Sequence, residues 1–435
     1  MIDGELKGKI HTYLINKTDF VKVKDKLSDD ELRVFVDRVI NEVCDRYHIN
    51  MAMEDRITLI RELVSSVVSL GPLRPLIEDP SVSEIMVNGP SKIYAQRDGK
   101  IQLTEIKFEN LQHISHTVQK ILAASGSSRR VDESSPYVDF SMPDGSRVNV
   151  ILPPCSMLGP VITIRKFSRE INTIDDLITR KMLDKKMAVL LIAAMKAKLN
   201  VVFCGATGTG KTTTLNVLSR HIPEEERIIT IEDTPELRLL QEHVVTLQSK
   251  PVNIEGKGEI TIADLFINSL RMRPDRIIIG EVRGIEMLDL IQSISSGHSG
   301  SLAIVHAESP EDCFNRMVNM MLMTGIRLST KEIQKQIARA IDLVVHIELF
   351  PDGVRRITYI SEIVYSEAAA IGSETSGPTD GEARIYMQDI FRFVQDKVEE
   401  DGRIVGHWDM NRKKPTFYKK FEKRHIKLPD GFFEG

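Results

Sequence analysis

The chain has 435 residues, a formal net charge of −4 and a charged fraction of 28%. This length allows two or three domains with cores of their own, and the near-neutral balance gives no overall bias toward nucleic acid or acidic lipid. The four cysteines lie far apart without a C-x-x-C pair, which excludes a zinc ribbon or a disulfide framework and favours a cytoplasmic setting. No apolar run approaches the ~20 residues of a membrane span, and Met1–Lys7 does not resemble a signal peptide. We therefore expect any membrane link to go through a partner.

Residues 1–65 are predicted to form a helical N-terminal domain. Ser28 and Glu31 have the spacing of a capping box, and apolar residues recur after them at helical spacing. These apolar positions are Leu32, Val36, Val39, Ile40 and Val43. The pattern indicates an amphipathic helical bundle without chemistry of its own.

Residues 66–166 are predicted to form a small α+β domain. Alternating apolar residues between Asn-Gly and Asp-Gly turns indicate strands, and residues 108–124 have the pattern of an amphipathic helix. The expected strands are 82–88, 92–97, 137–142, 147–152 and 161–166.

Residues 167–185 are predicted to be a linker, and residues 186–367 an α/β domain. A buried helix is expected over 187–197. A buried strand is expected over 200–203, and short apolar runs follow at 228–231 and 277–280. Such runs are typical of parallel strands covered by helices on both faces, which predicts a doubly wound sheet.

Residues 368–435 are predicted to be a linker and a small C-terminal extension. The Gly/Ser/Thr-rich stretch 372–381 indicates a flexible linker. Basic residues between 412 and 424 interleave with aromatic ones, a pattern that can indicate nucleic acid. The acidic balance of the whole chain favours a solvated or partner-facing tail instead.

The stretch 201–214 carries the most specific motif, an apolar run followed by the phosphate-loop pattern G-x-x-x-x-G-K-T that begins at Gly205. Glycines let backbone N–H groups wrap closely around phosphate, and the next helix adds the positive end of its dipole. Lys211 is suited to bridge the β- and γ-phosphates, and the Thr212 hydroxyl to ligate Mg²⁺. The predicted nucleotide-binding residues are Gly205, Ala206, Thr207, Gly208, Thr209, Gly210, Lys211, Thr212 and Thr213.

Three further strand ends carry candidate catalytic groups. Glu281 follows the run 277–280 and is suited to orient and deprotonate a water nucleophile. Glu232 and Asp233 follow the run 228–231, where they either hold Mg²⁺ or belong to an ordinary solvated turn. His306 ends an apolar run and is either a γ-phosphate sensor or a satisfied core histidine.

Taken in order, these motifs resemble those of the motor ATPases of type II and type IV secretion and pilus systems. The order is phosphate loop, Ile-Glu-Asp-Thr-Pro-Glu box, Gly-Glu-Val-Arg-Gly after Leu-Arg-Met-Arg-Pro-Asp-Arg, and Gly-His-Ser-Gly-Ser before Val-His-Ala. Upstream stretches at 70–76, 84–89, 129–136 and 144–149 are similar to the CpaF-like branch that serves Tad (tight adherence) pili. The four-cysteine zinc module common in type II secretion motors is absent from the sequence.

The resemblance implies a homo-hexamer of RecA-like P-loop domains, each preceded by a PAS-like α+β domain. It implies an ATP hydrolase that uses Mg²⁺, with Glu281, Glu232 and His306 as catalytic groups and Thr212, Glu232 and Asp233 as metal ligands. Catalytic arginines are implied at Arg147, Arg165, Arg271 and Arg273. The implied setting is the cytoplasm, peripheral to the inner face of the cell membrane, with an inner-membrane platform protein as partner and no nucleic acid.

Three alternatives fit a P-loop core. A nucleic-acid translocase or helicase predicts a basic channel, but the sequence has Gly-Glu rather than a DExx box. A nucleotide-gated scaffold without turnover is disfavoured because both Lys211 and Glu281 are present. A P-loop kinase has no need of a water-activating acid at Glu281.

Overall fold

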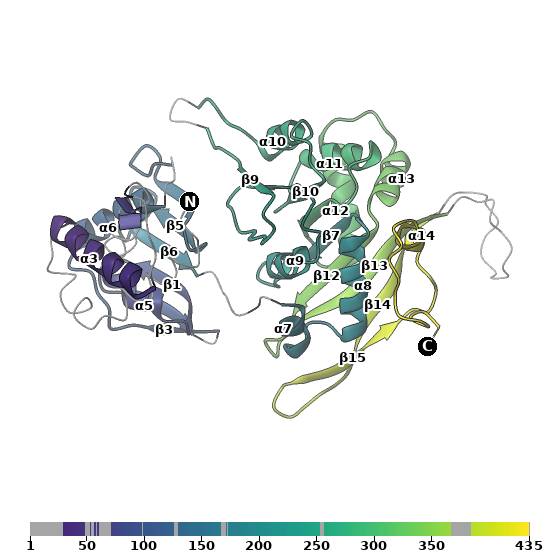
Figure 1. Cartoon of the computed structure of the whole chain (residues 1–435), viewed down its shortest axis with the longest axis horizontal. Coiled ribbons are helices and arrows are strands. Elements are labelled where there is room, and N and C mark those ends of the chain that lie inside the picture. Colours follow the sequence, from purple (N-terminus) through teal and green to yellow (C-terminus); the bar gives the residue numbers. More distant parts are fainter. Residues whose placement is uncertain are drawn as a thin grey trace. The chain divides into compact units, whose positions relative to one another are not determined.

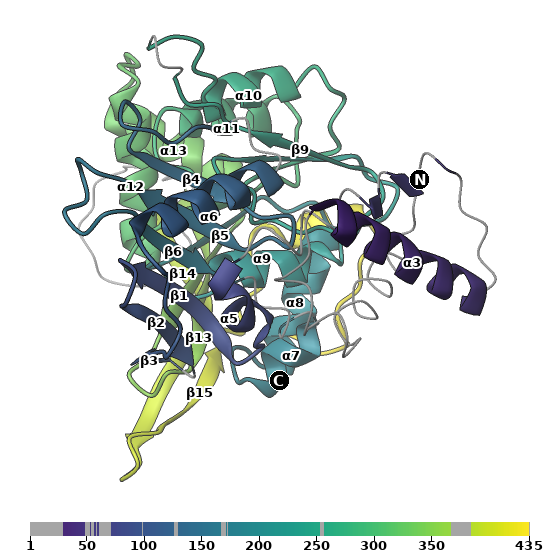
Figure 2. The same ribbon diagram turned by 90° about the vertical axis from the view of Figure 1, so that its left-hand side faces the viewer.

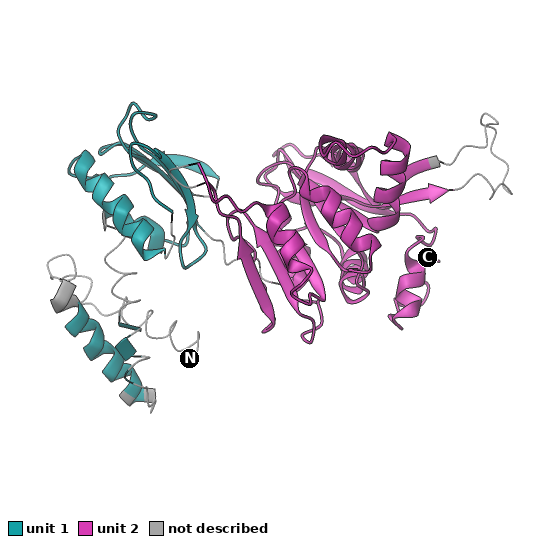
Figure 3. Cartoon of the chain, turned by 90° about the horizontal axis from the view of Figure 1, so that it is seen from above, with its two compact units in different colours: residues 1–168 teal, residues 169–435 magenta. Residues whose placement is uncertain are grey.

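The computed structural model describes residues 29–47, 53, 56–57, 59–60, 71–97, 99–125, 129–166, 171, 173–252, 256–366 and 384–434. The chain divides into two compact units, residues 1–168 and 169–435 (Figure 3). Two sequence predictions, the helix cap at Ser28 and the linker at 372–381, lie outside the described residues. In the described part of the chain, no helix has the length and apolar character of a membrane span.

The first unit begins with helix α3 (Asp29–Tyr47). Four residues of its predicted apolar stripe are buried: Val36, Val39 and Ile40 are fully shielded from solvent, and Val43 is 1% exposed. The expected amphipathic helix is therefore confirmed for this segment.

A six-stranded antiparallel sheet forms the body of the first unit, in the order β3-β2-β1-β6-β5-β4. Its strands are β1 (Val82–Asn88), β2 (Ile93–Arg97), β3 (Lys100–Leu103), β4 (Tyr137–Ser141), β5 (Arg147–Ile151) and β6 (Val161–Arg165). Short helical turns η2 (Gly71–Leu73) and α5 (Arg74–Glu78) precede it. Helix α6 (Leu111–Ala124) covers one face with an apolar side that includes Ile114 and Val118 (Figure 2). The predicted α+β arrangement is confirmed, and edge strand β3 is an addition to it.

A nine-stranded sheet organises the second unit, in the order β15-β14-β13-β12-β7-β11-β10-β8-β9. The strands from β12 to β9 in this order are parallel, and β13, β14 and β15 continue the sheet antiparallel. Their bounds are β7 (Val201–Gly205), β8 (Ile228–Glu232), β9 (Val244–Gln248), β10 (Arg276–Ile279), β11 (Leu302–His306), β12 (Leu343–Leu349), β13 (Arg355–Ser366), β14 (Arg384–Val398) and β15 (Ile404–Met410).

Helices cover both faces of this sheet (Figure 1). One face packs against α7 (Ile174–Thr179), α8 (Lys185–Lys196), α9 (Lys211–Ser219) and α14 (Tyr418–Lys423); the other packs against α10 (Ile262–Ser269), α11 (Glu286–Ser295), α12 (Pro310–Met323) and α13 (Thr330–Ala340). Successive residues of a strand point to opposite faces. In β7, Val201 and Phe203 accordingly join one core, and Val202 and Cys204 join the other. This confirms the doubly wound sheet.

The ends of the second unit differ from the expected outline. The predicted linker 167–185 contains α7, whose buried Leu177 packs in the core. The predicted C-terminal extension supplies two strands of the main sheet, and β14 and β15 project from it as a two-stranded ribbon (Figure 1). Phe391 and Phe421 are at most 1% exposed within this core. The extension is thus an integral part of the second unit.

Candidate active site

The phosphate-loop sequence forms the predicted strand–loop–helix unit. β7 lies between β11 and β12 in the parallel part of the sheet, and α9 begins at Lys211, directly after the loop. Gly205, Gly208 and Gly210 have φ angles of 150°, 79° and 97°. A Cβ at Gly205 would lie 2.1 Å from the Ile347 carbonyl oxygen, so the backbones approach too closely there for any side chain. The glycines of the motif are therefore required by the path of the chain.

Lys211 lies inside the loop. Its side chain is almost completely buried, and its Nζ donates hydrogen bonds to the carbonyl oxygens of Gly205 at 2.9 Å and Ala206 at 2.6 Å. Thr212 and Thr213 follow on the first turn of α9, whose backbone N–H groups favour an anion. The loop thus combines a cation, a hydroxyl and a helix N-terminus within a few residues.

Glu281 and His306 meet beside this loop. β11 pairs with both β7 and β10, and its last residue, His306, is in register with Gly205. Glu281 follows β10, and its Oε1 lies 3.1 Å from Nε2 of His306. Arg283 donates from Nη2 to Oε2 of Glu281 at 2.6 Å. The carboxyl ends of three neighbouring strands therefore bring together the lysine loop, a carboxylate and an imidazole.

Arg283 is a site residue that the sequence reasoning did not assign. Its position two residues after Glu281, on the same Gly-Glu-Val-Arg segment, is the signal that could have identified it. Its contact fixes the second oxygen of the carboxylate whose first oxygen faces His306.

The electrostatics of the pair favour an ionised acid and a neutral imidazole. Burial alone raises the pKa of Glu281, but the hydrogen bond and charge of Arg283, together with His306 and Lys211, outweigh it and lower that pKa. Burial, reinforced by the charge of Lys211, lowers the pKa of His306. At neutral pH, Glu281 is a carboxylate able to accept a proton, and neutral His306 can donate Nε2–H to it.

Glu232 and Asp233 are engaged elsewhere. The buried carboxylate of Glu232 accepts hydrogen bonds from the backbone N–H groups of Glu236 at 2.8 Å and Leu237 at 3.0 Å. Burial nevertheless raises its pKa to about 7. Asp233 accepts from the Ser249 hydroxyl at 2.7 Å. The turn that Glu232 holds also contacts α9, because the Asn216 side chain accepts from Arg238 N at 2.9 Å and donates to the Glu236 carbonyl oxygen at 3.4 Å.

Gly280 makes room for Glu232. A Cβ at Gly280 would lie 2.6 Å from Cγ of Glu232 and 3.0 Å from its Oε2. The glycine before Glu281 is therefore a packing requirement of the neighbouring strand.

Arg147 and Arg165 are cross-strand partners in the first unit. They face each other in the register of β5 and β6, and Nε of Arg165 lies 3.8 Å from Oε1 of Glu84. Like charges directly opposite each other in a sheet are destabilising by up to about 1 kcal/mol. The pair therefore places two positive charges on one face of this sheet, and Glu84 lies near the charge of Arg165.

Arg271 and Arg273 lie at the opposite edge of the parallel strands from the phosphate loop of their own chain. Both precede β10, at the amino ends of the parallel strands, where Arg271 donates to the Ile267 carbonyl oxygen at 3.2 Å. The loop follows β7 at the carboxyl ends, and the four residues of β10 separate the two edges by about 13 Å. Arg271 and Arg273 are close to Glu281 in sequence but not in space, because strand β10 lies between them and Glu281.

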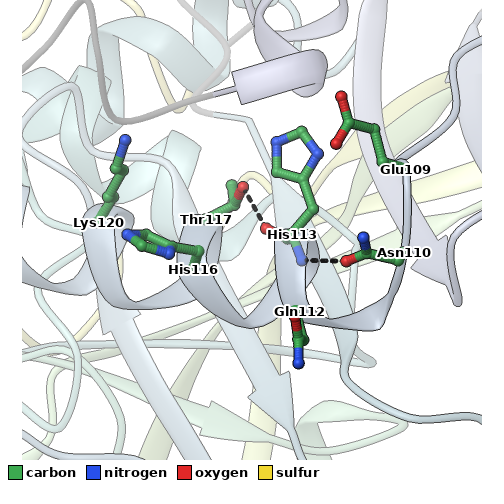
Figure 4. Close-up of a pocket in the computed structure, with 7 residues that line it drawn as sticks. All are labelled: Glu109, Asn110, Gln112, His113, His116, Thr117 and Lys120. Carbon is green, nitrogen blue, oxygen red and sulfur yellow. Dashed lines mark hydrogen bonds between the residues drawn. The ribbon is translucent and has the colours of Figure 1, made fainter.

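A separate pocket lies on the first unit (Figure 4). Its described lining comes from α6 and the two residues before that helix: Glu109, Asn110, Gln112, His113, His116, Thr117 and Lys120. None of these residues belongs to the predicted site.

A glycine-rich loop that wraps a buried lysine, beside a carboxylate and an imidazole at neighbouring strand ends, defines a P-loop nucleoside triphosphatase. Comparison with known proteins narrows this class. The family described as type II/IV secretion system protein matches residues 66–390, and the chain belongs to it. It is an ATP-hydrolysing enzyme with a RecA-like P-loop domain, as the motif order had indicated.

Individual relatives span most of the same region. VirB11 of a Brucella suis type IV secretion system is 31% identical over 329 residues, 68% of this chain and 89% of that protein. A putative conjugal transfer protein of Mycobacterium tuberculosis is 29% identical over 337 residues, 75% of this chain and 95% of that protein. An uncharacterised protein of Methanocaldococcus jannaschii is 35% identical over 303 residues, 66% of this chain and 41% of that protein.

Solved structures of similar proteins include two secretion and pilus ATPases. The crystal structure of Brucella suis VirB11 with sulphate has 29% identity and a TM-score of 0.36, and covers 68% of this chain and 97% of that one. The pilus retraction motor PilT with bound ADP has 18% identity and a TM-score of 0.47, and covers 67% of this chain and 81% of that one.

Proposed function

We propose that this protein is a hexameric cytoplasmic motor that hydrolyses Mg-ATP to power pilus assembly or retraction, or secretion, through an inner-membrane platform. The observation that carries this proposal is the junction of the Lys211 loop, Glu281 and His306 at the ends of β7, β10 and β11. Family membership supports the link to secretion and pilus systems. The upstream motifs at 70–76, 84–89, 129–136 and 144–149 favour a Tad pilus system in particular.

Each residue has a distinct part in hydrolysis. Lys211 neutralises charge on the β- and γ-phosphates within the loop. Glu281, held ionised by Arg283, orients the attacking water and accepts its proton. His306 donates to the carboxylate oxygen of Glu281 that Arg283 does not contact. A shift of Glu281 on binding or loss of the γ-phosphate is therefore passed to His306, the last residue of β11.

Thr212 is the residue that best fits a magnesium ion. Its hydroxyl stands at the start of α9, directly after Lys211, whereas the carboxylates of Glu232 and Asp233 are committed to protein donors. When bound, Mg²⁺ supplies neutralisation of the phosphate oxygens. A role for Glu232 or Asp233 as ligand is compatible with these hydrogen bonds, because an ionised carboxylate has about four lone-pair sites.

To convert ATP hydrolysis into movement, a motor needs a catalytic group that reaches the nucleotide only after a conformational change, which we call closure. We assign this part to Arg147 and Arg165, which are cross-strand neighbours in β5 and β6 and so can offer two guanidinium groups to a multiply charged anion. Donors that reach the phosphates only in the closed state stabilise developing charge without strengthening ground-state binding. Because Arg271 and Arg273 lie at the far edge of the sheet from their own loop, any catalytic part for them is assigned to the nucleotide of a neighbouring subunit.

A nucleic-acid translocase is the less favoured reading of the same core. Basic clusters bind single strands through exposed aromatic rings on which bases stack. In the basic tail, Phe417 and Phe421 are at most 4% exposed, and Tyr418 packs edge-on against Phe421 and Phe433. These rings stabilise the fold and are not presented to bases.

The experiment that tests the proposal is a steady-state ATPase assay on the full-length protein, with and without the detergent-solubilised platform protein. We expect Mg²⁺-dependent hydrolysis that the platform protein stimulates and that single-stranded or duplex DNA leaves unchanged. Stimulation by DNA and not by the platform protein would favour the translocase.

A further inference from the structure

Arg355 connects a distant strand to the phosphate loop. It begins β13, and its Nε donates a hydrogen bond of 2.9 Å to the carbonyl oxygen of Gly208, 147 positions earlier in the chain. Its Cδ also lies 3.2 Å from the point that a Cβ at Gly210 would occupy. One side chain from outside the motif therefore touches the loop at two of its glycines.

The hydrogen bond acts on the part of the loop where glycine residues leave the backbone conformationally free. Gly208 and Gly210 have φ angles of 79° and 97°, in the region that only glycine enters freely. In a trans peptide the C=O and the following N–H point in opposite directions. A donor fixed to the Gly208 oxygen therefore also fixes the direction of the Thr209 N–H. Backbone N–H groups held in fixed directions are what a loop uses to bind phosphate.

The backbone that carries Arg355 is itself held firmly. In the turn before it, Asp352 accepts from Val354 N at 3.0 Å and from Arg356 Nη2 at 2.7 Å. The hydrogen bond with Arg356 is the largest cause that lowers the pKa of Asp352 to about 2. On the other side, Ile357 N donates to the Met182 carbonyl oxygen at 2.7 Å.

The same turn is joined to β15. Asp352 Oδ2 accepts from Ile404 N, and Arg356 Nη2 donates to Ile404 O, both at 3.0 Å. Arg355 thus acts from a rigid base built by β12, β13 and β15.

We propose that Arg355 is a positioning residue that presets the phosphate loop for nucleotide by holding the Gly208 carbonyl. The inference rests on the proposed nucleotide site and adds a residue that the motif does not contain. The hydrogen bond fixes the peptide between Gly208 and Thr209 and does not involve the γ-phosphate. Loss of this hydrogen bond therefore weakens the binding of ADP and of ATP equally.

The test compares Arg355→Met and Arg355→Lys with Arg392→Met. Arg392 is an exposed arginine on the neighbouring strand β14, 5.9 Å from the Tyr359 ring centroid, and makes the matched control. Dissociation constants for ADP and for a slowly hydrolysed ATP analogue are measured by calorimetry, with kcat at saturating ATP and the Tm of the nucleotide-free protein.

For Arg355→Met we expect both dissociation constants to rise about tenfold to a hundredfold, the range for one hydrogen bond from a charged donor. We expect kcat to stay within about threefold, because an interaction made equally in ground and transition states changes affinity alone. Lysine retains a donor, so Arg355→Lys restores part of the affinity, and Arg392→Met behaves as wild type.

Three results would overturn the inference. Unchanged affinity for both nucleotides shows that the Arg355–Gly208 hydrogen bond does not contribute to nucleotide binding. Loss of ATP affinity alone shows that Arg355 reads the γ-phosphate directly. A fall in affinity matched by a fall in Tm that lysine does not rescue shows a purely structural role. Lys211→Ala, measured in parallel, distinguishes failure of this inference from failure of the proposed nucleotide site. Retained nucleotide affinity in Lys211→Ala contradicts the site itself.

Discussion

Replacement of Glu232 by glutamine tests whether burial of this acid at the end of β8 makes the stability of the fold depend on pH. Its pKa in the folded chain is about 7, against an ordinary value of 4.5. Burial is the cause, because the amides of Glu236 and Leu237 that favour the carboxylate compensate only in part. The folded state therefore prefers protonated Glu232, whereas the unfolded chain ionises it near its ordinary pKa.

The sign and size of the effect follow from these two pKa values. Because the folded pKa is the higher one, the stabilising contribution is complete below pH 4.5 and is lost as the pH rises through about 7. A difference of about 2.5 between the pKa values corresponds to roughly 3 kcal/mol, at about 1.4 kcal/mol per pKa unit. About 2 kcal/mol of this falls between pH 5.5 and 8.5.

The assay is urea unfolding between pH 5.5 and 8.5, followed through Trp408. This is the single tryptophan of the chain, and it lies on β15 of the second unit, where its Nε1 donates to the Ile357 carbonyl oxygen. Glu232→Gln should flatten the pH profile by about 2 kcal/mol. Glu242→Gln, an exposed glutamate in the connection after β8, is the matched control and keeps the wild-type slope. Parallel profiles for wild type and Glu232→Gln would show that Glu232 does not titrate differently in the folded and unfolded chains.

Further predictions concern catalysis. Glu281→Gln should bind ATP normally and hydrolyse it at least ~10²-fold more slowly, in single-turnover assays; near-normal turnover would remove Glu281 from the role of general base. Arg147→Ala or Arg165→Ala should keep ATP affinity within a few-fold and lower kcat by ~10²–10³; full kcat in variants whose oligomer size, measured by light scattering, equals that of the wild type would exclude a catalytic part for the first unit. Arg271→Ala or Arg273→Ala should leave the nucleotide affinity of the single subunit unchanged, measured by fluorescence titration at concentrations where light scattering shows a monomer; a large loss there would place these side chains at their own loop.

The local motifs were predictable because their geometry is contained in contiguous sequence. The loop from Gly205 to Thr212 needs glycine torsions, a lysine and a helix start within eight positions, and the structure supplies each of them. The apolar runs at 228–231 and 277–280 likewise show both faces of a buried strand in their own residues. Edge strand β3 escaped prediction because all four of its residues are exposed, which leaves no buried face to create a pattern.

The properties that depend on neighbouring strands were not predictable. The sequence shows Glu232 as an acid after a strand, but its burial and its two amide partners depend on the turn that folds back over it. Arg271 is close to Glu281 in sequence and at the opposite edge of the sheet in space. Arg355 carries no motif, and only the pairing of β12 with both β7 and β13 brings it to Gly208.

The most direct test of the account is phosphate release from Mg-ATP by the purified full-length protein and by Lys211→Ala. Lys211 is the cation inside the loop, and every step assigned to Glu281 and His306 requires a nucleotide bound there. We expect steady Mg²⁺-dependent phosphate release by the wild type, and loss of both this release and tight Mg-ATP binding in the variant. Phosphate release that persists in Lys211→Ala would contradict the assignment of this loop as the site of ATP hydrolysis.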